Sequence, residues 1–372
     1  MTTTTSTELA SILSELGPTF AARAAEHDDV DRYVGANFEA LKARGVLAAG
    51  VPAELGGGGA SYRELCDFLR ELAHHCPSTA LALSMHMHQV MIPEWRWRNE
   101  GGAGEPLLRR VAAEHLHLVS TGGSDWLESS GSLEEVEGGY RFTARKVFSS
   151  GSPSGDLLIT SGVLDDAVEG PTVLHFPVSL RADGVKVQDN WRTLGMRGTG
   201  SNDVLIEGVF VPDAAIGGRR PRGAWGIFHL VAMLALPLIY SVYVGIAEQA
   251  RDLALERATG RREDLDVRMN VGEMENRLRA AQIALDSVIA LAEHSKPGPV
   301  TTNEALIRRT LIGNDVLAVV DKAMAVTGGG AFFRSFGLEQ LFRDAQGARY
   351  HPLTEKRQLD YTARIALGMS ID

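Results

Sequence analysis

The sequence predicts an α+β protein in which a strand-rich middle segment lies between two helical segments. Apolar residues recur at three- and four-residue steps before about residue 116 and again after about residue 222, which is the period of a buried helix face. Between them lie short alternating runs separated by turn residues, as in antiparallel strands. A chain of 372 residues is also too long for one ordinary core. We therefore expect a helical N-terminal domain at 1–116, a middle domain of antiparallel strands, as a sheet or barrel, at 117–221, and a helical domain at 222–372.

The composition is that of a globular protein. Hydrophobic residues make up 44% and charged residues 23% of the chain, so a packed core is expected rather than disorder. The net charge of −10 comes without a Lys/Arg run, which argues against a nucleic-acid partner. The two cysteines, Cys66 and Cys76, show no disulfide or metal spacing, and the first residues lack the regions of a signal peptide. We expect a cytoplasmic protein.

The N-terminal segment combines an amphipathic pattern with a glycine-rich connection. Leu65, Phe68, Leu69 and Leu72 fall on one face of a predicted helix. The stretch 51–61 contains four consecutive glycines, but it lacks the last glycine of a dinucleotide fingerprint and the Lys-Ser/Thr ending of a phosphate loop. We expect a plain loop there.

The middle segment contains five alternating runs that we expect to be strands. Glycine- and serine-rich pieces at 120–125, 149–152 and 194–201 separate them. Such pieces supply backbone N–H groups and hydroxyls that can surround an anionic or heterocyclic ligand, and they can equally be simple turns. The expected strands lie at 140–144, 156–161, 172–178, 184–188 and 203–211.

Long helices are expected at 227–261, 271–293 and 302–326. The part from 227 to 247 is almost wholly apolar and, at about 20 residues, long enough to cross a bilayer. Pro237 lies in its middle, His229 lies near its start, and the helical pattern continues into an amphipathic stretch at Glu248. We expect a buried core helix and no membrane contact.

Four short motifs, spaced along nearly the whole chain, carry a resemblance to one known family. In order, they are 51–57 with 77–84, 146–151, 194–199 with 211–212, and 328–329 with 342–345. Together they resemble the acyl-CoA dehydrogenase superfamily of flavoproteins. The resemblance implies a helical N-terminal domain, a middle antiparallel β-barrel, a C-terminal four-helix bundle and a homotetramer whose flavin sites border a neighbouring subunit.

The resemblance also implies a flavin cofactor, FAD or FMN, and residues that hold it. Ser150 falls where the family places a hydroxyl near the flavin N5, Phe148 where it places an aromatic side chain, and Ser149 lies between them. Ser124 belongs to Gly-Ser-Asp, the remnant of a longer flavin-contacting stretch in the family.

A second set of matches implies further cofactor contacts, and the motif around Arg257 is one that often meets a neighbouring subunit's cofactor in the family. Arg257 and the glycine after it remain from a motif whose phenylalanine is lost. Gly328 and Gly329 are the family's paired glycines, and Thr354 follows near the C-terminal end of the resemblance. We expect these four residues to contribute to cofactor binding.

The carboxylate that a dehydrogenase of this family requires is missing at both of its usual places. That reaction removes a proton next to a thioester carbonyl and needs a carboxylate in an apolar pocket. Counting along the motifs puts Pro352 at one position and Ala235 at the other. Neither takes up a proton, so dehydrogenation requires another carboxylate, such as Glu94 or Asp125, to reach the pocket.

An oxygen-using branch of the superfamily, the two-component flavin monooxygenases, lacks that glutamate and has histidine and serine in its pocket. His351 is similar to the C-terminal histidine of that branch, and Ser149-Ser150 to its serine pair. Of His86 and His88, at most one points inward because residues two apart on a helix face different ways, and we favour His88. A hydrogen-bonded structural role is the alternative for each histidine. The histidine pairs lack a matching Cys/Asp/Glu set, so we expect no metal site.

The leading hypothesis is a monooxygenase that uses reduced flavin and O2 on a small aromatic, sulfur or amine substrate, with His351, Ser150 and His88 as catalytic residues. A separate reductase would supply the flavin because no nicotinamide fingerprint is visible. The alternatives are an FAD-dependent acyl-CoA dehydrogenase with a relocated base and a non-catalytic flavin-binding relative.

Overall fold

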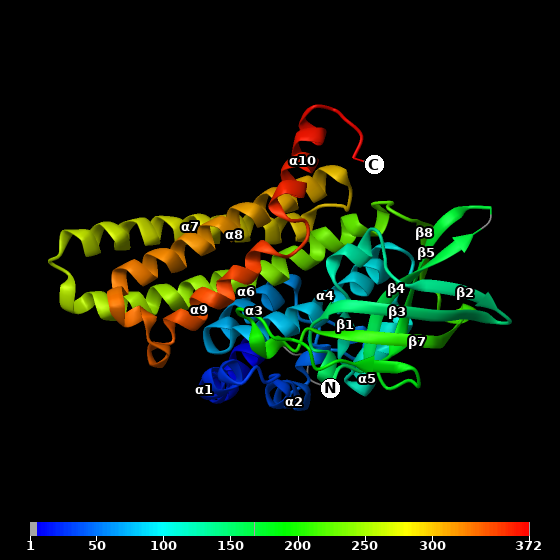
Figure 1. Ribbon diagram of the computed structural model, residues 1–372, viewed down its shortest axis with the longest axis horizontal. Coiled ribbons are helices and arrows are strands. Elements are labelled where there is room, and N and C mark those ends of the chain that lie inside the picture. The colour runs from blue at the N-terminus through cyan, green and yellow to red at the C-terminus, as the bar shows by residue number, and fades with distance from the viewer. Residues whose placement is uncertain (1–5, 167, 372) are drawn as a thin grey trace.

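The computed structural model describes residues 6–166 and 168–371, except for the side chains of residues 6, 7 and 124. Long helices extend to one end of the molecule and the strands lie at the other, with the N-terminal helices beneath their junction (Figure 1). The order of helices, strands and helices agrees with the α+β class expected from the sequence.

The N-terminal segment is helical. The predicted helix face is confirmed in α3, where Leu65, Phe68, Leu69 and Leu72 are all buried. This helix starts at a capping box, in which Ser61 Oγ accepts the Glu64 N–H at 3.3 Å and the Glu64 carboxylate accepts the Ser61 N–H at 2.7 Å. The helices are α1 (Ser6–Asp29), α2 (Gly35–Ala43), α3 (Tyr62–His75), α4 (Pro77–Asn99) and α5 (Glu105–Glu114).

The middle segment forms one eight-stranded sheet, ordered β6-β7-β3-β2-β4-β5-β8, with β1 paired to β4 outside this path. All five predicted runs are strands, at β3, β4, β5, β6 and β7. The sequence pattern did not indicate the short β1 and β8, or β2. The strands are β1 (Leu118–Ser120), β2 (Ser132–Val136), β3 (Gly139–Ser149), β4 (Leu157–Asp166), β5 (Gly170–Ser179), β6 (Val185–Val187), β7 (Asn202–Pro212) and β8 (Gly218–Pro221).

The expected antiparallel barrel is wrong in two respects. Strands β1 and β2 both run parallel to β4, so the sheet is mixed. In the described part of the chain β6 and β8 are the two ends of the strand path and do not pair, so the sheet is open. An alternating pattern identifies a strand, but it carries no information on the direction of the strand beside it.

The C-terminal segment contains the expected four-helix bundle in an uneven form. Three long helices pack on one another, and the short α9 packs on α6 and α8. The helix α10 contacts α8 and stands out from the bundle near the C-terminus (Figure 1). The helices are α6 (Gly226–Ala258), α7 (Leu265–His294), α8 (Pro299–Thr327), α9 (Leu338–Ala345) and α10 (Glu355–Ala366).

Helix α6 is the core helix of the molecule. Its apolar part is long enough to cross a membrane, but the whole of its most apolar window is buried inside the structure. It packs against α3 and α4 of the N-terminal segment and against α7, α8 and α9 of the bundle. The apolar run is therefore a buried core element, as expected.

A glycine on α6 allows its close approach to α3. A Cβ atom on Gly245 would overlap the carbonyl oxygen of Arg70, and backbone atoms move only with their helix. Gly272 on α7 has no atom within 4 Å of the position that a Cβ would take. The two helical glycines therefore differ in packing although they share the same backbone conformation.

We expect Gly245→Ala to lower the free energy of unfolding by ~1–3 kcal/mol, because the added methyl group forces α6 and α3 apart. Gly272→Ala should raise it by up to ~1 kcal/mol, since alanine is the better helix former in open space. Urea unfolding followed by circular dichroism measures both. Equal effects of the two substitutions would contradict the close approach of α6 to α3.

Two buried histidines connect α4 to the start of the sheet. The His86 Nδ1 accepts the Leu118 N–H at 3.0 Å, and its Nε2–H donates to the Leu47 carbonyl at 2.8 Å. The ring of His117 stacks on Phe38 with 4.6 Å between centroids and meets the His86 ring edge at 5.6 Å. Burial lowers the pKa of His86 to about 4 and that of His117 to about 3. Both are neutral structural residues at neutral pH, and the alternative role left open for His86 is the observed one.

Because these buried histidines are neutral in the folded protein, we expect its stability to fall at acid pH. A base whose pKa is lowered in the folded state binds fewer protons than in the unfolded chain, so the free energy of unfolding falls as pH drops from about 6.5 towards 4. Replacing His86 by Gln should make this slope shallower by ~1 kcal/mol per pH unit. The exposed His115 serves as control, through His115→Asn. If His86→Gln leaves the slope of unfolding free energy against pH the same as in the unmodified protein, His86 is not a source of the acid sensitivity.

Candidate functional site

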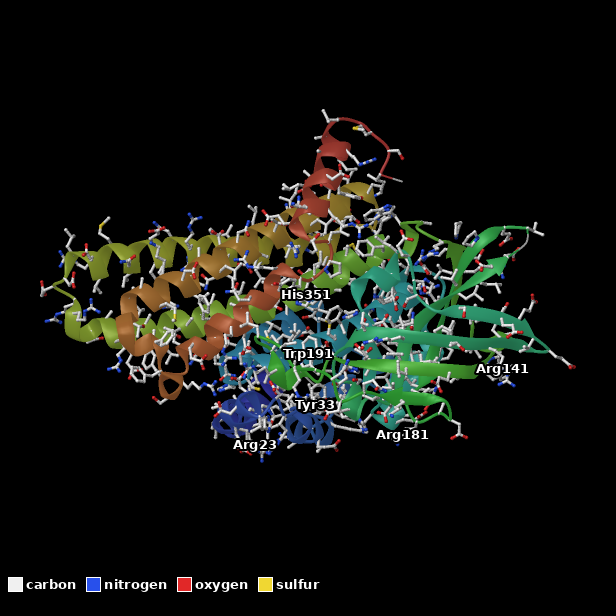
Figure 2. The ribbon with its side chains drawn as sticks, in the orientation of Figure 1. Arg23, Tyr33, Arg141, Arg181, Trp191 and His351 are labelled. Carbon is white, nitrogen blue, oxygen red and sulfur yellow. The ribbon has the colours of Figure 1, made fainter. Side chains whose placement is uncertain are left out.

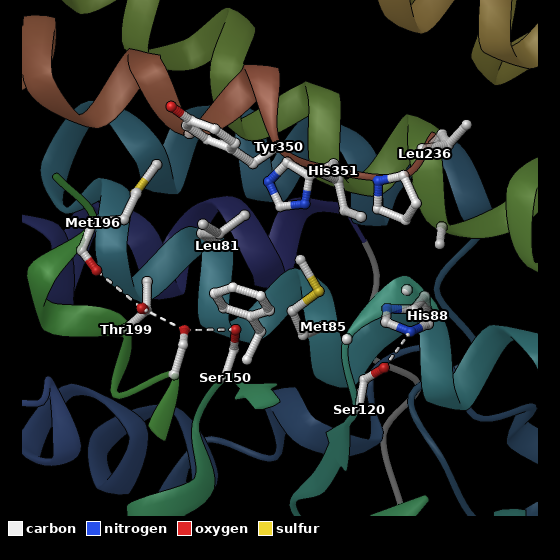
Figure 3. A pocket seen from close by; sticks show the side chains of 18 of the residues that line it. Leu81, Met85, His88, Ser120, Ser150, Met196, Thr199, Leu236, Tyr350 and His351 are labelled. Atoms are coloured by element: carbon white, nitrogen blue, oxygen red, sulfur yellow. Dashed lines mark hydrogen bonds between the residues drawn. The ribbon is translucent and has the colours of Figure 1, made fainter. Parts of the chain in front are cut away.

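A cavity of about 540 Å³ lies where α4, α6, the sheet and the segment after α9 meet. His351 and Trp191, which both line it, lie in the middle of the molecule (Figure 2). In the close view, Ser150 and His351 stand on opposite walls and His88 lies to one side beside Ser120 (Figure 3). The three residues predicted as catalytic are therefore brought together around one cavity.

The sheet wall is built by a bulge at the end of β3. The pairing of β3 with β7 shifts register between Lys146 and Ser149, and Phe148 has a left-handed φ of 57°. A bulge turns side chains out of the regular alternation, and bulges and sparsely populated backbone conformations are over-represented at functional sites. Phe148 is thereby held at the cavity rim, where its ring meets the edge of Trp191 at 6.0 Å between centroids.

A chain of hydroxyl groups fixes the direction in which Ser150 can hydrogen-bond. The Thr199 hydroxyl donates to the Met196 carbonyl at 2.9 Å, so its one proton is used. The Ser201 hydroxyl, 2.7 Å from it, must then donate to Thr199, and Ser150, 2.8 Å from Ser201, must donate to Ser201 (Figure 3). Ser150 therefore presents lone pairs, and no proton, to the cavity.

His88 is neutral and its ring nitrogens are engaged. Its Nδ1–H donates to the Ser84 carbonyl at 3.2 Å, which leaves Nε2 as an acceptor for the Gln89 amide at 2.9 Å. The Ser120 hydroxyl is also 3.2 Å from Nε2. Burial lowers the pKa of His88 to about 4. The geometry suits a residue that orients its neighbours, while its predicted catalytic role stays a prediction.

His351 has one engaged and one open ring nitrogen. Its Nε2 lies 2.6 Å from the hydroxyl of Tyr243 on α6, whereas its Nδ1 has no hydrogen-bond partner among the described residues. Its main-chain carbonyl accepts from Arg309 at 2.7 Å. Burial, together with the charge of Arg309, lowers the pKa of His351 to about 3. The His351 side chain is thus uncharged at neutral pH.

The cavity lacks the base of a dehydrogenase. Ala235 and Pro352, at the two family positions of that base, both line it. No Asp or Glu is among the described residues of its wall. Asp125 forms an ion pair with the buried Lys146 at 2.7 Å, and Glu94 pairs with Arg98, so neither replaces the missing carboxylate.

The Lys146–Asp125 pair supports the cavity from behind. Lys146 on β3 is completely buried, and its ammonium group also donates to the carbonyls of Ser130 and Ser161, each at 2.7 Å. Asp125 lies in η3 (Gly123–Trp126), the turn that brings Gly123 and Trp126 to the cavity wall. Lys146 follows the buried Tyr140 and Phe142 on the inward side of the alternating strand β3, and a lysine in that position is the sequence signal for such a buried ion pair.

The other predicted cofactor residues, apart from Phe148 and Ser150, are not among those that line this cavity. Ser149 is buried but does not line it. Arg257 lies at the far end of α6, with its guanidinium 5.1 Å from the Phe336 ring centre, near η8 (Gly328–Phe332). Thr354 is exposed before α10. Ser124 has its backbone in η3, and its side chain lies outside the described residues. Their predicted contacts stay predictions. Met196 belongs to the motif at 194–199, whereas sequence reasoning did not single out the lining residues Trp191 and Tyr243.

The two walls suit a flavin ring. A flavin has apolar faces, a polar edge and a size that fits a cavity of this volume. Phe148 and Trp191 supply aromatic surface, and Ser150 supplies an acceptor beside them. The opposite wall is apolar, with Leu81, Met85, Ala232, Leu236 and Ile239 on α4 and α6. Among the described residues, no group of three or more His, Cys, Asp or Glu side chains is placed to hold a metal ion.

Similar proteins agree with this geometry. The N-terminal domain model of the acyl-CoA dehydrogenases matches residues 12–100, and their C-terminal domain model matches residues 238–356. The chain is 30% identical to the amino sugar nitrososynthase RubN8 of Streptomyces rubradiris, over 98% of this chain and 90% of that protein. It is 29% identical to dibenzothiophene monooxygenase of Mycolicibacterium goodii, over 59% of this chain and 54% of that protein.

A solved structure extends the likeness to three dimensions. The structure of KijD3 in complex with dTDP superimposes with a TM-score of 0.87 and 25% sequence identity, covering 97% of this chain and 96% of that one. Fold, family models and full-length relatives lead to the same assignment, as do the alanine and proline in place of the base. The chain belongs to the acyl-CoA dehydrogenase superfamily, in its branch of flavin-dependent monooxygenases.

Proposed function

We propose that this monooxygenase transfers oxygen to the amine nitrogen of a small organic molecule, and that its substrate is an amino sugar carried on a nucleotide. The observation that carries the proposal is the carboxylate-free cavity, with Ala235 and Pro352 at the base positions and neutral histidines on its walls. Support for the substrate class comes from RubN8, an amino sugar nitrososynthase, and from KijD3, which binds dTDP.

The cavity suits amine oxygenation because it keeps an amine uncharged. Oxygen transfer uses the nitrogen lone pair, which an ammonium ion lacks. A buried carboxylate would hold the amine protonated, whereas an apolar cavity disfavours the charged form. Here no described lining residue carries a negative charge, and the guanidinium of Arg309 behind His351 adds positive charge nearby.

The residues around the cavity would have different roles in the reaction. A reduced flavin, when bound, reduces O2 and supplies one oxygen atom for transfer. Phe148 and Trp191 would hold the ring, and Ser150 would accept a hydrogen bond from its edge. His351 would donate from Nδ1 towards the oxygen being transferred. The apolar side chains of α4 and α6 exclude water, which would otherwise divert the oxygen to peroxide.

The remaining family expectations complete the proposal. A separate reductase supplies the reduced FMN or FAD, the enzyme works in the cytoplasm, and it assembles as a homotetramer. In that assembly Arg257, towards the end of α6 away from the cavity-lining residues, would contact the cofactor of a neighbouring subunit, and Gly328, Gly329 and Thr354 would contribute to cofactor binding.

The proposed reaction is tested by incubating the protein with reduced FMN or FAD, O2 and a dTDP-linked amino sugar. Mass spectrometry should find the hydroxylamine, heavier by one oxygen, followed by the nitroso product. Dibenzothiophene, tested in the same way, measures whether the enzyme oxygenates sulfur instead of an amine. An acyl-CoA under anaerobic conditions is the dehydrogenase arm, where bleaching of bound oxidised FAD, without oxygenation of the amine, would overturn the proposal.

The hydroxyl chain predicts a preference for reduced flavin. The N5 of a reduced flavin carries a hydrogen and donates, whereas the N5 of oxidised flavin only accepts, and Ser150 offers only lone pairs. We expect Ser201→Ala to free the Ser150 proton and to narrow the ratio of reduced to oxidised flavin affinity by about fivefold, the worth of one hydrogen bond. Fluorescence titration with each redox form measures this ratio.

Ser152→Ala is the matched control for that experiment. Ser152 is buried and donates to the Gly200 carbonyl at 3.2 Å, but it does not line the cavity. Removing the Ser152 hydroxyl also breaks one buried hydrogen bond, but it leaves the chain of hydroxyl groups from Ser150 to the Met196 carbonyl unchanged. An affinity ratio that changes equally in both variants would show that the hydroxyl chain does not set the redox preference.

A further inference from the structure

Tyr243 joins the core helix to the cavity. It lies on α6, is completely buried and lines the cavity beside His351. A Cβ atom on Gly347 would come within 2.6 Å of its hydroxyl oxygen, so the glycine leaves the space into which that hydroxyl fits. Because the hydroxyl lies 2.6 Å from His351 Nε2, the two side chains share one short hydrogen bond.

The direction of this hydrogen bond follows from which acceptors lie within reach of the Tyr243 hydroxyl. If His351 Nε2–H donated to Tyr243, the phenolic proton would need a second acceptor, and the described residues offer none. A buried donor without an acceptor is costly. If Tyr243 donates to Nε2, its proton is satisfied. Burial raises the pKa of Tyr243 far above its usual value, so the phenol keeps that proton.

The neutral state of the imidazole has a separate structural cause. Arg309 on α8 is buried and donates to the main-chain carbonyl of His351 at 2.7 Å and to that of Ala348 at 3.3 Å. Its guanidinium also lies 5.5 Å from the Tyr240 ring centre. Burial lowers the pKa of His351 most, and the Arg309 charge, which also holds the loop in place, lowers it further. With Nε2 as acceptor, the single proton of the neutral ring lies on Nδ1.

We propose that Tyr243 is a positioning residue that fixes His351 in the tautomer with its proton on Nδ1, so that an uncharged N–H donor faces the site of oxygen transfer. The role in oxygen transfer rests on the proposed function, whereas the tautomer does not. His88 shows the opposite arrangement, because its Nδ1–H is used by Ser84 and its Nε2 accepts from Gln89. Of these two cavity histidines, only His351 has an N–H left for a ligand.

The tautomer is measured directly by nitrogen NMR of the flavin-free protein labelled with ¹⁵N-histidine, with the His351 signals assigned by their loss in His351→Asn. The unmodified protein should show a protonated Nδ1 and an unprotonated Nε2 at neutral pH. In Tyr243→Phe, Nε2 loses its donor and the other tautomer should appear. A protonated Nε2 in the unmodified protein would overturn the proposal, whatever the enzyme's activity.

Tyr240→Phe is the matched control. Tyr240 lies one turn earlier on α6, is equally buried, and donates its hydroxyl to the Ala348 carbonyl at 2.7 Å. It anchors the same loop but leaves the imidazole nitrogens untouched. Both substitutions remove one buried hydroxyl, so their effects on the thermal midpoint should be similar. A merely structural role for Tyr243 predicts that neither variant changes the His351 tautomer.

The functional consequence is measured as product formed per flavin oxidised, with peroxide counted separately. Tyr243→Phe should lower this ratio about tenfold, with the loss appearing as peroxide, and Tyr240→Phe should change it little. His351→Asn keeps an amide N–H near the position of Nδ1, whereas His351→Gln places it near Nε2, so the Asn variant should retain more product. If the tautomer is as inferred but no oxygenated product forms with any amine, the proposed function fails and the tautomer assignment stands.

Discussion

The burial of the apolar part of α6 on every side is the constraint on which the rest of this structure depends. A helix this apolar has no stable place in contact with water, so α3, α4, α7, α8 and α9 enclose it. One face, with Ala235, Ile239 and Tyr243 at four-residue steps, points to the cavity. Another, at Gly245, lies against the α3 backbone. The same helix thus sets the packing of the core and the wall of the site.

The second organising feature is that the described residues of the cavity wall, Arg343 apart, carry no ionised group. Burial keeps His88 and His351 neutral, and the Tyr243 phenol retains its proton. Asp344, just behind the wall, is fully buried and accepts the Met196 N–H; burial raises the pKa of its carboxyl to about 7. The charged pair Lys146–Asp125 lies behind the turn at η3. Polar groups here are therefore distinguished by the direction of their hydrogen bonds, and the roles proposed for Ser150 and His351 rest on the positions of their protons.

Much of the fold was predictable because its signals are local. The three long helices of the bundle and all five predicted strands follow from periodicity, and the four-helix bundle followed from the family resemblance. The openness of the sheet and the parallel pairing of β1 and β2 with β4 were not predictable, because pairing direction depends on where the chain returns in space. The short β1 carries only three residues, too few for a periodic pattern.

The sequence by itself determined which residues occupy the base positions, since Ala235 and Pro352 are found by counting along motifs, and both line the cavity. It also indicated His351, Ser150 and His88. Only the tertiary structure decided how these groups are hydrogen-bonded. Tyr243 meets His351 across 108 residues of sequence, and Ser150 meets Ser201 across 51. A hydrogen bond's direction depends on every partner within reach, and those partners come together only when the helices and the sheet pack.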